Sequence, residues 1–79
     1  MSFVATFYTH LAALRSQRSL SGRGVNARLA PVPRALSSSC GTCVFYEGEE
    51  PLLETLDRDV EGVYRRTEGG YETILQSEL

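Results

Sequence analysis

Strand-like and helix-like segments follow one another along this chain in the order βαββαβ, and few folds accommodate that order. The strand-like segments are rich in β-branched and aromatic residues, and the helix-like segments carry apolar residues at helical spacing. We expect strands over residues 3–8, 25–29, 42–46 and 60–66, and helices over residues 10–20 and 49–59. The order is typical of a ferredoxin-like α+β sandwich, in which two helices cover one face of a four-stranded antiparallel sheet.

Local signals support these boundaries. Thr9 offers a hydroxyl that caps the first helix, and Gly22 and Gly24 end it because glycine takes the left-handed turn at low cost. Pro31 and Pro33 stop the second strand, since proline lacks the N–H that a sheet requires. The second helix has acids and proline in its first turn and leucines on its buried face: Glu49, Glu50, Pro51, Leu52, Leu53 and Leu56.

A chain of 79 residues supports one small core, so residues 1–79 are assigned to a single domain. Residues 67–79 form either a hairpin extension, with an extra edge strand at 71–75, or a flexible tail. The expected strand order across the sheet is 4-1-3-2. This topology brings His10, the start of the first helix, the loop that holds Cys40 and the start of the fourth strand to one end of the sheet.

The chain offers its most reactive chemistry in Ser37–Cys43, which holds both of its cysteines. A thiol reacts as its thiolate, which cationic groups, helix N-termini and hydrogen-bond donors favour. We expect Cys40 to be the exposed, reactive thiol and His10 to act as a base or a hydrogen-bond partner. The residues expected to bind the thiolate or another anion are Arg34, Ser37, Ser38, Ser39 and Gly41.

Charge is distributed unevenly along the chain. Residues 1–46 contain five arginines and no acidic residue, whereas residues 47–79 contain three arginines and all ten acidic residues. The first part therefore carries a net charge of +5 and the second −7. Because both cysteines lie in the basic part, the sequence predicts electropositive surroundings for Cys40. The same asymmetry suits self-association, which leaves a homodimer open.

Cys43 is expected to differ from Cys40 because it is the second residue of a predicted strand. Residues two apart in a strand share a face, which places Cys43 with Phe45 and opposite Val44 and Tyr46. The pattern does not tell which of these faces the helices cover. Strand hydrogen bonds should make Cys43 less mobile and less reactive than Cys40.

Several blocks of the chain resemble the selenium/sulfur carrier-like family of small bacterial proteins. The blocks are Pro31–Arg34, Leu36–Gly41 with the apolar strand after it, Thr6-Phe7 with Thr9-His10, and Val60–Tyr64. The resemblance implies a cytoplasmic carrier, more than a stand-alone enzyme, whose Cys40 holds sulfur or selenium as a persulfide or selenenyl-sulfide. Its partners would be a cysteine desulfurase-like donor and a sulfur or selenium acceptor protein. Cys43 departs from the family pattern, which often has a small residue without a thiol there, and this admits a resolving thiol.

Two other functions stay open. Cys40-Gly41-Thr42-Cys43 has the spacing of a dithiol redox pair, in which Cys40 attacks and Cys43 resolves, although it leads into a strand and not into a helix. A regulatory or binding module without covalent chemistry is also compatible with a ferredoxin-like fold.

Other classes are disfavoured. Two cysteines and one histidine fall short of the four ligands of a structural zinc site, so we expect no metal and no cofactor. Acidic overall charge without a stacked-aromatic motif argues against nucleic-acid binding. No segment has the run of apolar residues that a membrane span needs, and the N-terminus has no secretory signal pattern, so we expect a cytoplasmic protein without membrane association.

Overall fold

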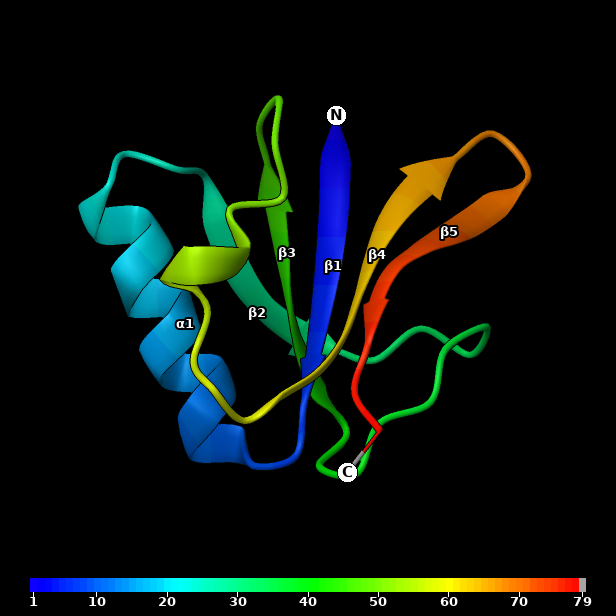
Figure 1. The fold of residues 1–79 in the computed structure, drawn as a ribbon, viewed down its shortest axis with the longest axis horizontal. Coiled ribbons are helices and arrows are strands. Elements are labelled where there is room, and N and C mark those ends of the chain that lie inside the picture. The colour runs from blue at the N-terminus through cyan, green and yellow to red at the C-terminus, as the bar shows by residue number, and fades with distance from the viewer. Residues whose placement is uncertain (79) are drawn as a thin grey trace.

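A computed structural model describes residues 1–78 as one twisted antiparallel sheet with a single α-helix packed on one face (Figure 1). The helix is α1 (His10–Gly22), and a short 3-10 turn, η1, covers Leu53–Thr55. The strands are β1 (Ser2–Phe7), β2 (Ala27–Pro31), β3 (Thr42–Glu47), β4 (Val60–Thr67) and β5 (Gly70–Gln76).

The sheet has the order β2-β3-β1-β4-β5, with every neighbouring pair antiparallel. The order 4-1-3-2 predicted for the first four strands is confirmed, and of the two alternatives left open for residues 67–79 the structure shows the extra edge strand, which is β5. Strand β1 lies in the centre and pairs with β3 from Ser2↔Glu47 to Thr6↔Cys43. Residues 3–7 are all buried, so β1 is covered on both of its faces.

The hydrophobic core lies between the sheet and α1. Thr9 caps the helix as predicted, because its Oγ1 accepts a hydrogen bond from the Ala12 N–H at 3.1 Å. The helix buries Ala12, Ala13, Ser16 and Leu20. The sheet contributes large side chains to the same cluster, namely Phe3, Phe7, Val44, Tyr46 and Val63. The small helix residues allow α1 to lie close to the aromatic side chains of the sheet.

The prediction of a ferredoxin-like sandwich with two helices is wrong. The sheet has five strands, and the segment expected to form a second helix at 49–59 contains only η1. Leu52 has a φ of 51°, a left-handed conformation that a continuous α-helix excludes. The segment still covers the core, since Leu56 is buried and Leu52 packs against the cluster.

Tertiary hydrogen bonds explain why the leucine pattern at 52–56 did not produce a helix. The Tyr46 hydroxyl donates to the Pro51 carbonyl at 2.6 Å, and the Asp57 N–H donates to Ser16 Oγ at 2.8 Å. An isolated helix of this length is marginal in water, because its first turn is costly to nucleate. Contacts that fix both ends of the segment in a non-helical path therefore override its local preference.

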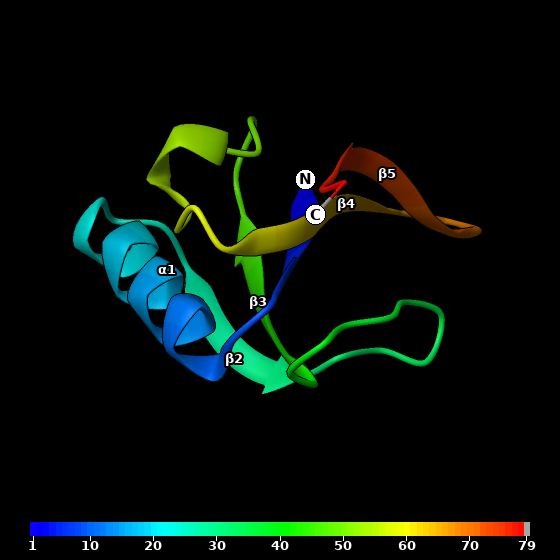
Figure 2. The same ribbon diagram turned by 60° about the horizontal axis from the view of Figure 1, so that its bottom comes forward.

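Within residues 1–78, no helix covers the second face of the sheet. Its central side chains, Val4, Thr6 and Cys43, are nevertheless fully buried. The loop of residues 32–41, hereafter the thiol loop, connects β2 to β3 and extends beneath β4 and β5 on the side away from α1 (Figure 2). A polar loop in place of a helix leaves room for a functional site on this side.

Replacing Ser16 with alanine should test the contact that holds the 49–59 segment. Ser16 is fully buried, and its loss leaves the Asp57 N–H without its acceptor. We expect Ser16→Ala to lower the free energy of unfolding by about 1–2 kcal/mol. The matched control Ser19→Ala, at an exposed position of α1, should leave it unchanged or raise it slightly. Urea unfolding followed by circular dichroism measures both, and equal effects would contradict this role of Ser16.

Candidate functional site

The thiol loop is closed at its neck and anchored to the sheet. The Val32 N–H donates to the Gly41 carbonyl at 3.2 Å, which brings the two ends of the loop together. Gly41 has a φ of 76°, a conformation that glycine adopts without strain. The Ser38 hydroxyl donates to the Phe7 carbonyl at 3.1 Å, so the loop is also fastened to the end of β1.

Cys40 is a half-buried free thiol at the base of this loop. Its side chain packs against the helix-side core, and its Sγ donates a hydrogen bond to the Thr42 carbonyl at 3.4 Å. Ser38 Oγ lies 4.0 Å from the sulfur. Cys40 is therefore held in place but has exposed neighbours, Ser39 and Gly41, on both sides.

His10 lies at the same end of the sheet, as the strand order predicted. Its Nδ1 is 3.2 Å from Thr42 Oγ1. Thr42 thus links the two groups, because its carbonyl accepts from Cys40 and its hydroxyl contacts His10. His10 thus contacts Thr42, which in turn contacts the sulfur of Cys40. Its proposed role as a base remains a prediction.

Glu61 of β4 completes this end of the sheet, and sequence reasoning did not single it out as a site residue. Its Oε1 accepts from the Ser39 N–H at 2.9 Å, and its Oε2 accepts from the Ser39 hydroxyl at 3.1 Å. The pairing of β1 with β4 passes from Thr6↔Gly62 to Phe7↔Val60, so Glu61 has no partner on β1. Such a bulge re-aims a side chain, and here it turns the carboxylate toward the thiol loop.

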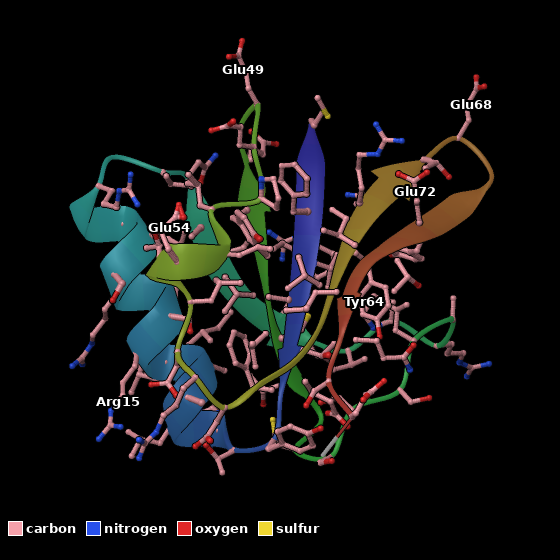
Figure 3. All side chains as sticks on the ribbon, viewed as in Figure 1. Arg15, Glu49, Glu54, Tyr64, Glu68 and Glu72 are labelled. Atoms are coloured by element: carbon pink, nitrogen blue, oxygen red, sulfur yellow. The ribbon has the colours of Figure 1, made fainter. Side chains whose placement is uncertain are left out.

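Three labelled glutamates lie far from the thiol loop. Glu49, Glu68 and Glu72 lie toward the opposite end of the sheet (Figure 3). Glu61, in contrast, contacts the loop directly through Ser39. Arg34 is exposed in the loop, and within residues 1–78 no hydrogen bond or ion pair of its guanidinium is seen. Whether Arg34 favours a thiolate at Cys40 remains a prediction.

The remaining predicted residues are also located. The Ser38 hydroxyl donates to the Phe7 carbonyl and the Ser39 hydroxyl donates to the Glu61 carboxylate. In this conformation both hydroxyls therefore donate to groups of the protein and not to the Cys40 sulfur. Ser37 is exposed and lines a pocket beside the loop. The structure thus brings Ser38 close to Cys40, while Ser37 and Ser39 face β4.

Cys43 belongs to a different environment from Cys40. Val44 and Tyr46 join the helix-side core, so Cys43 and Phe45 face the other side of the sheet. Cys43 is fully buried, and its Sγ donates to the Pro31 carbonyl at 3.5 Å. Burial raises the pKa of the Cys43 thiol from 9.0 to about 11, while Arg28 lowers this pKa and Cys40 raises it by smaller amounts. Cys43 is therefore protonated and inaccessible at neutral pH.

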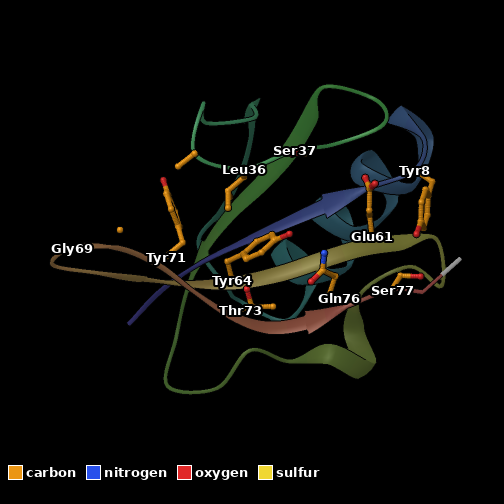
Figure 4. Close-up of a pocket in the computed structure, with 12 residues that line it drawn as sticks. Tyr8, Leu36, Ser37, Glu61, Tyr64, Gly69, Tyr71, Thr73, Gln76 and Ser77 are labelled. Carbon is orange, nitrogen blue, oxygen red and sulfur yellow. The ribbon is translucent and has the colours of Figure 1, made fainter.

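A pocket of about 530 Å³ lies between the thiol loop and the β4–β5 hairpin (Figure 4). Tyr8, Tyr64 and Tyr71 supply its aromatic walls, and Glu61 reaches it from β4. A Cβ atom at Gly62 would lie 2.5 Å from the Tyr64 hydroxyl, so only glycine allows the Tyr64 side chain to lie along the strand. This explains the glycine at position 62 within Val60–Tyr64.

The fold and the site define a small antiparallel-sheet protein with one accessible thiol in a loop at the end of the sheet. Residues 2–65 match the family described as "Putative Se/S carrier protein-like". The chain belongs to this family, as its resemblance indicated. It matches no curated protein and no solved structure.

Two further findings concern metal ligands and membrane-spanning helices. Within residues 1–78, no three side chains among His, Cys, Asp and Glu are grouped so that they could hold a metal ion. The same residues include no helix that is long and apolar enough to cross a membrane.

The raised pKa of Cys43 predicts a loss of stability at alkaline pH. The pKa of Cys43 is higher in the folded state than in the unfolded state, so the folded protein favours the neutral thiol. The free energy of unfolding is therefore unaffected by this group below pH 9.0 and falls as the pH rises from 9.0 to about 11. The loss should reach roughly 2–3 kcal/mol. Burial, with a smaller contribution from Glu54, also raises the pKa of Tyr46, which acts in the same direction.

Comparing the wild type with Cys43→Ala isolates the contribution of Cys43 to the pH dependence of stability, because Tyr46 is present in both proteins. We expect the unfolding free energy of the variant, measured in urea at several pH values, to decline less between pH 9 and 11. Parallel declines in the two proteins would contradict the assignment.

Proposed function

We propose that Cys40 carries sulfur or selenium as a persulfide or selenenyl-sulfide between a cysteine desulfurase-like donor and an acceptor protein. The observation that supports this most is the contrast between the two thiols within a selenium/sulfur carrier-like family. Cys40 lies half-buried in a loop with exposed neighbours, whereas Cys43 is fully buried within β3. One accessible thiol is what a carrier needs.

The loading step transfers a single outer sulfur between two cysteines. The Cys40 thiolate attacks the outer sulfur of a persulfide on the donor. A bond forms between Cys40 Sγ and that sulfur, the S–S bond of the donor breaks, and the donor cysteine leaves as a thiolate. The Cys40 proton passes to solvent or to the departing thiolate. Delivery reverses the roles, since an acceptor thiolate attacks the outer sulfur and the Cys40 thiolate leaves.

Neighbouring groups support both states of Cys40. In the free thiol, the S–H donates to the Thr42 carbonyl. When the proton has left, rotation of the Ser38 hydroxyl redirects its hydrogen from the Phe7 carbonyl to the sulfur 4.0 Å away. Gly41 leaves the approach open, since no side chain covers the backbone next to the sulfur.

The buried position of Cys43 argues against a dithiol mechanism. A resolving thiol must reach the attacking one, but Cys43 donates to Pro31 on the face of the sheet away from α1. Because its pKa is raised, Cys43 stays protonated at neutral pH, and a protonated thiol is not the nucleophilic form. We therefore assign no redox step to Cys43.

Loading should depend on one cysteine only. After incubation with a cysteine desulfurase and cysteine, intact mass spectrometry should show a gain of one sulfur atom in the wild type and in Cys43→Ser. The matched variant Cys40→Ser should gain none. Full loading of Cys40→Ser would end the carrier assignment, and equal loss in both variants would favour a dithiol mechanism.

A further inference from the structure

The pocket beside the thiol loop is separate from the sulfur and has a distinct chemistry. Its volume of about 530 Å³ lies in the range of small-ligand sites. The strand residues that line it, Tyr64, Thr73 and Gln76, occupy paired positions on the second face of the sheet, with Tyr64↔Thr73 and Gly62↔Gln76 in register. Ser37 closes it from the loop side. Two rigid strands and one loop therefore build the pocket.

We propose that this pocket binds an organic cation, an ammonium or guanidinium group, against the Tyr64 ring with Glu61 as its counter-charge. Glu61 is the one charged side chain among the described residues that line the pocket. Aromatic faces attract cations, and Tyr64 lines the part of the pocket next to Glu61, whereas Tyr71 lines its far end (Figure 4). The hydroxyl and amide oxygens of Thr73 and Gln76 are further acceptors for N–H donors.

The same composition disfavours other ligands. No arginine, lysine or histidine is among the described lining residues, so an anion would lack a counter-charge. A free amino acid would place its carboxylate in the same space as Glu61, which like-charge repulsion opposes. The ligand class is therefore a cation without a neighbouring carboxylate, such as a free amine or a lysine or arginine side chain of another protein.

A ligand that binds Glu61 would also change the surroundings of Ser39 in the thiol loop. Each carboxylate oxygen already accepts one hydrogen bond from Ser39 and retains capacity for another. A cation in the pocket therefore shares Glu61 with Ser39, which is the residue before Cys40. The Ser39 amide becomes a direct reporter of occupancy, and this inference stands independently of whether Cys40 carries sulfur.

The test titrates matched probes into the unmodified protein and follows amide shifts by nuclear magnetic resonance. The probes are lysine with blocked termini, its neutral analogue norleucine with blocked termini, and butylamine. We expect blocked lysine to shift the Ser39 and Glu61 amides and to bind at least about tenfold more tightly than blocked norleucine. Butylamine binding as tightly as blocked lysine assigns the cation to a free amine, whereas tighter binding of blocked lysine assigns it to a protein side chain.

Two variants separate charge from structure. Glu61→Gln removes the negative charge but keeps an oxygen that accepts from Ser39, so it should abolish the preference for the cationic probe while the protein stays folded. Glu68→Gln, on the exposed β4–β5 turn outside the pocket, should bind like the wild type. Equal affinity for lysine and norleucine, no binding of either, or an unchanged preference in Glu61→Gln would overturn the proposal.

Discussion

Two hydrogen bonds from Ser39 to the Glu61 carboxylate join the loop that carries the thiol to the rigid part of the protein. Bonds to an ionised acceptor are stronger than neutral ones, and the paired geometry fixes orientation as well as distance. Without them, the thiol loop would be held on the sheet chiefly by the hydrogen bond from Ser38 to the Phe7 carbonyl at the end of β1. The bulge that aims Glu61 is therefore part of the site, although Glu61 is 21 residues beyond Cys40 in the sequence.

The sheet separates two thiols that are only three residues apart. Cys40 precedes β3 and packs toward the helix-side core from the end of the sheet, whereas Cys43 lies within β3 and faces the opposite side. One thiol is thus available to partners, and the other serves as a buried apolar residue. This arrangement explains how a chain of the selenium/sulfur carrier-like family accommodates a second cysteine without requiring a disulfide.

Local patterns predicted α1, its Thr9 cap and the positions of the strands, although β2 extends to Pro31, a proline expected to stop it. Topology then predicted that His10 and the thiol loop share one end of the sheet. The second helix was predicted wrongly because contacts from Tyr46 and Ser16, distant in sequence, decide the path of residues 49–59. Glu61 was missed as a site residue because a bulge sets its direction, and Gly62, a glycine inside a predicted strand, was a sequence signal of that bulge that was not used. Sequence alone likewise left open which side of β3 the helix covers.

The claim that Glu61 holds the thiol loop on β4 is tested most directly by hydrogen exchange at the Ser39 amide. In the wild type this amide should be protected, and Glu61→Ala should speed its exchange by about tenfold or more. The Leu36 amide, which donates to the Pro33 carbonyl within the loop, and the matched variant Glu68→Ala serve as references that should change little. A Ser39 amide that exchanges freely in the wild type, or equally in both variants, would contradict the account.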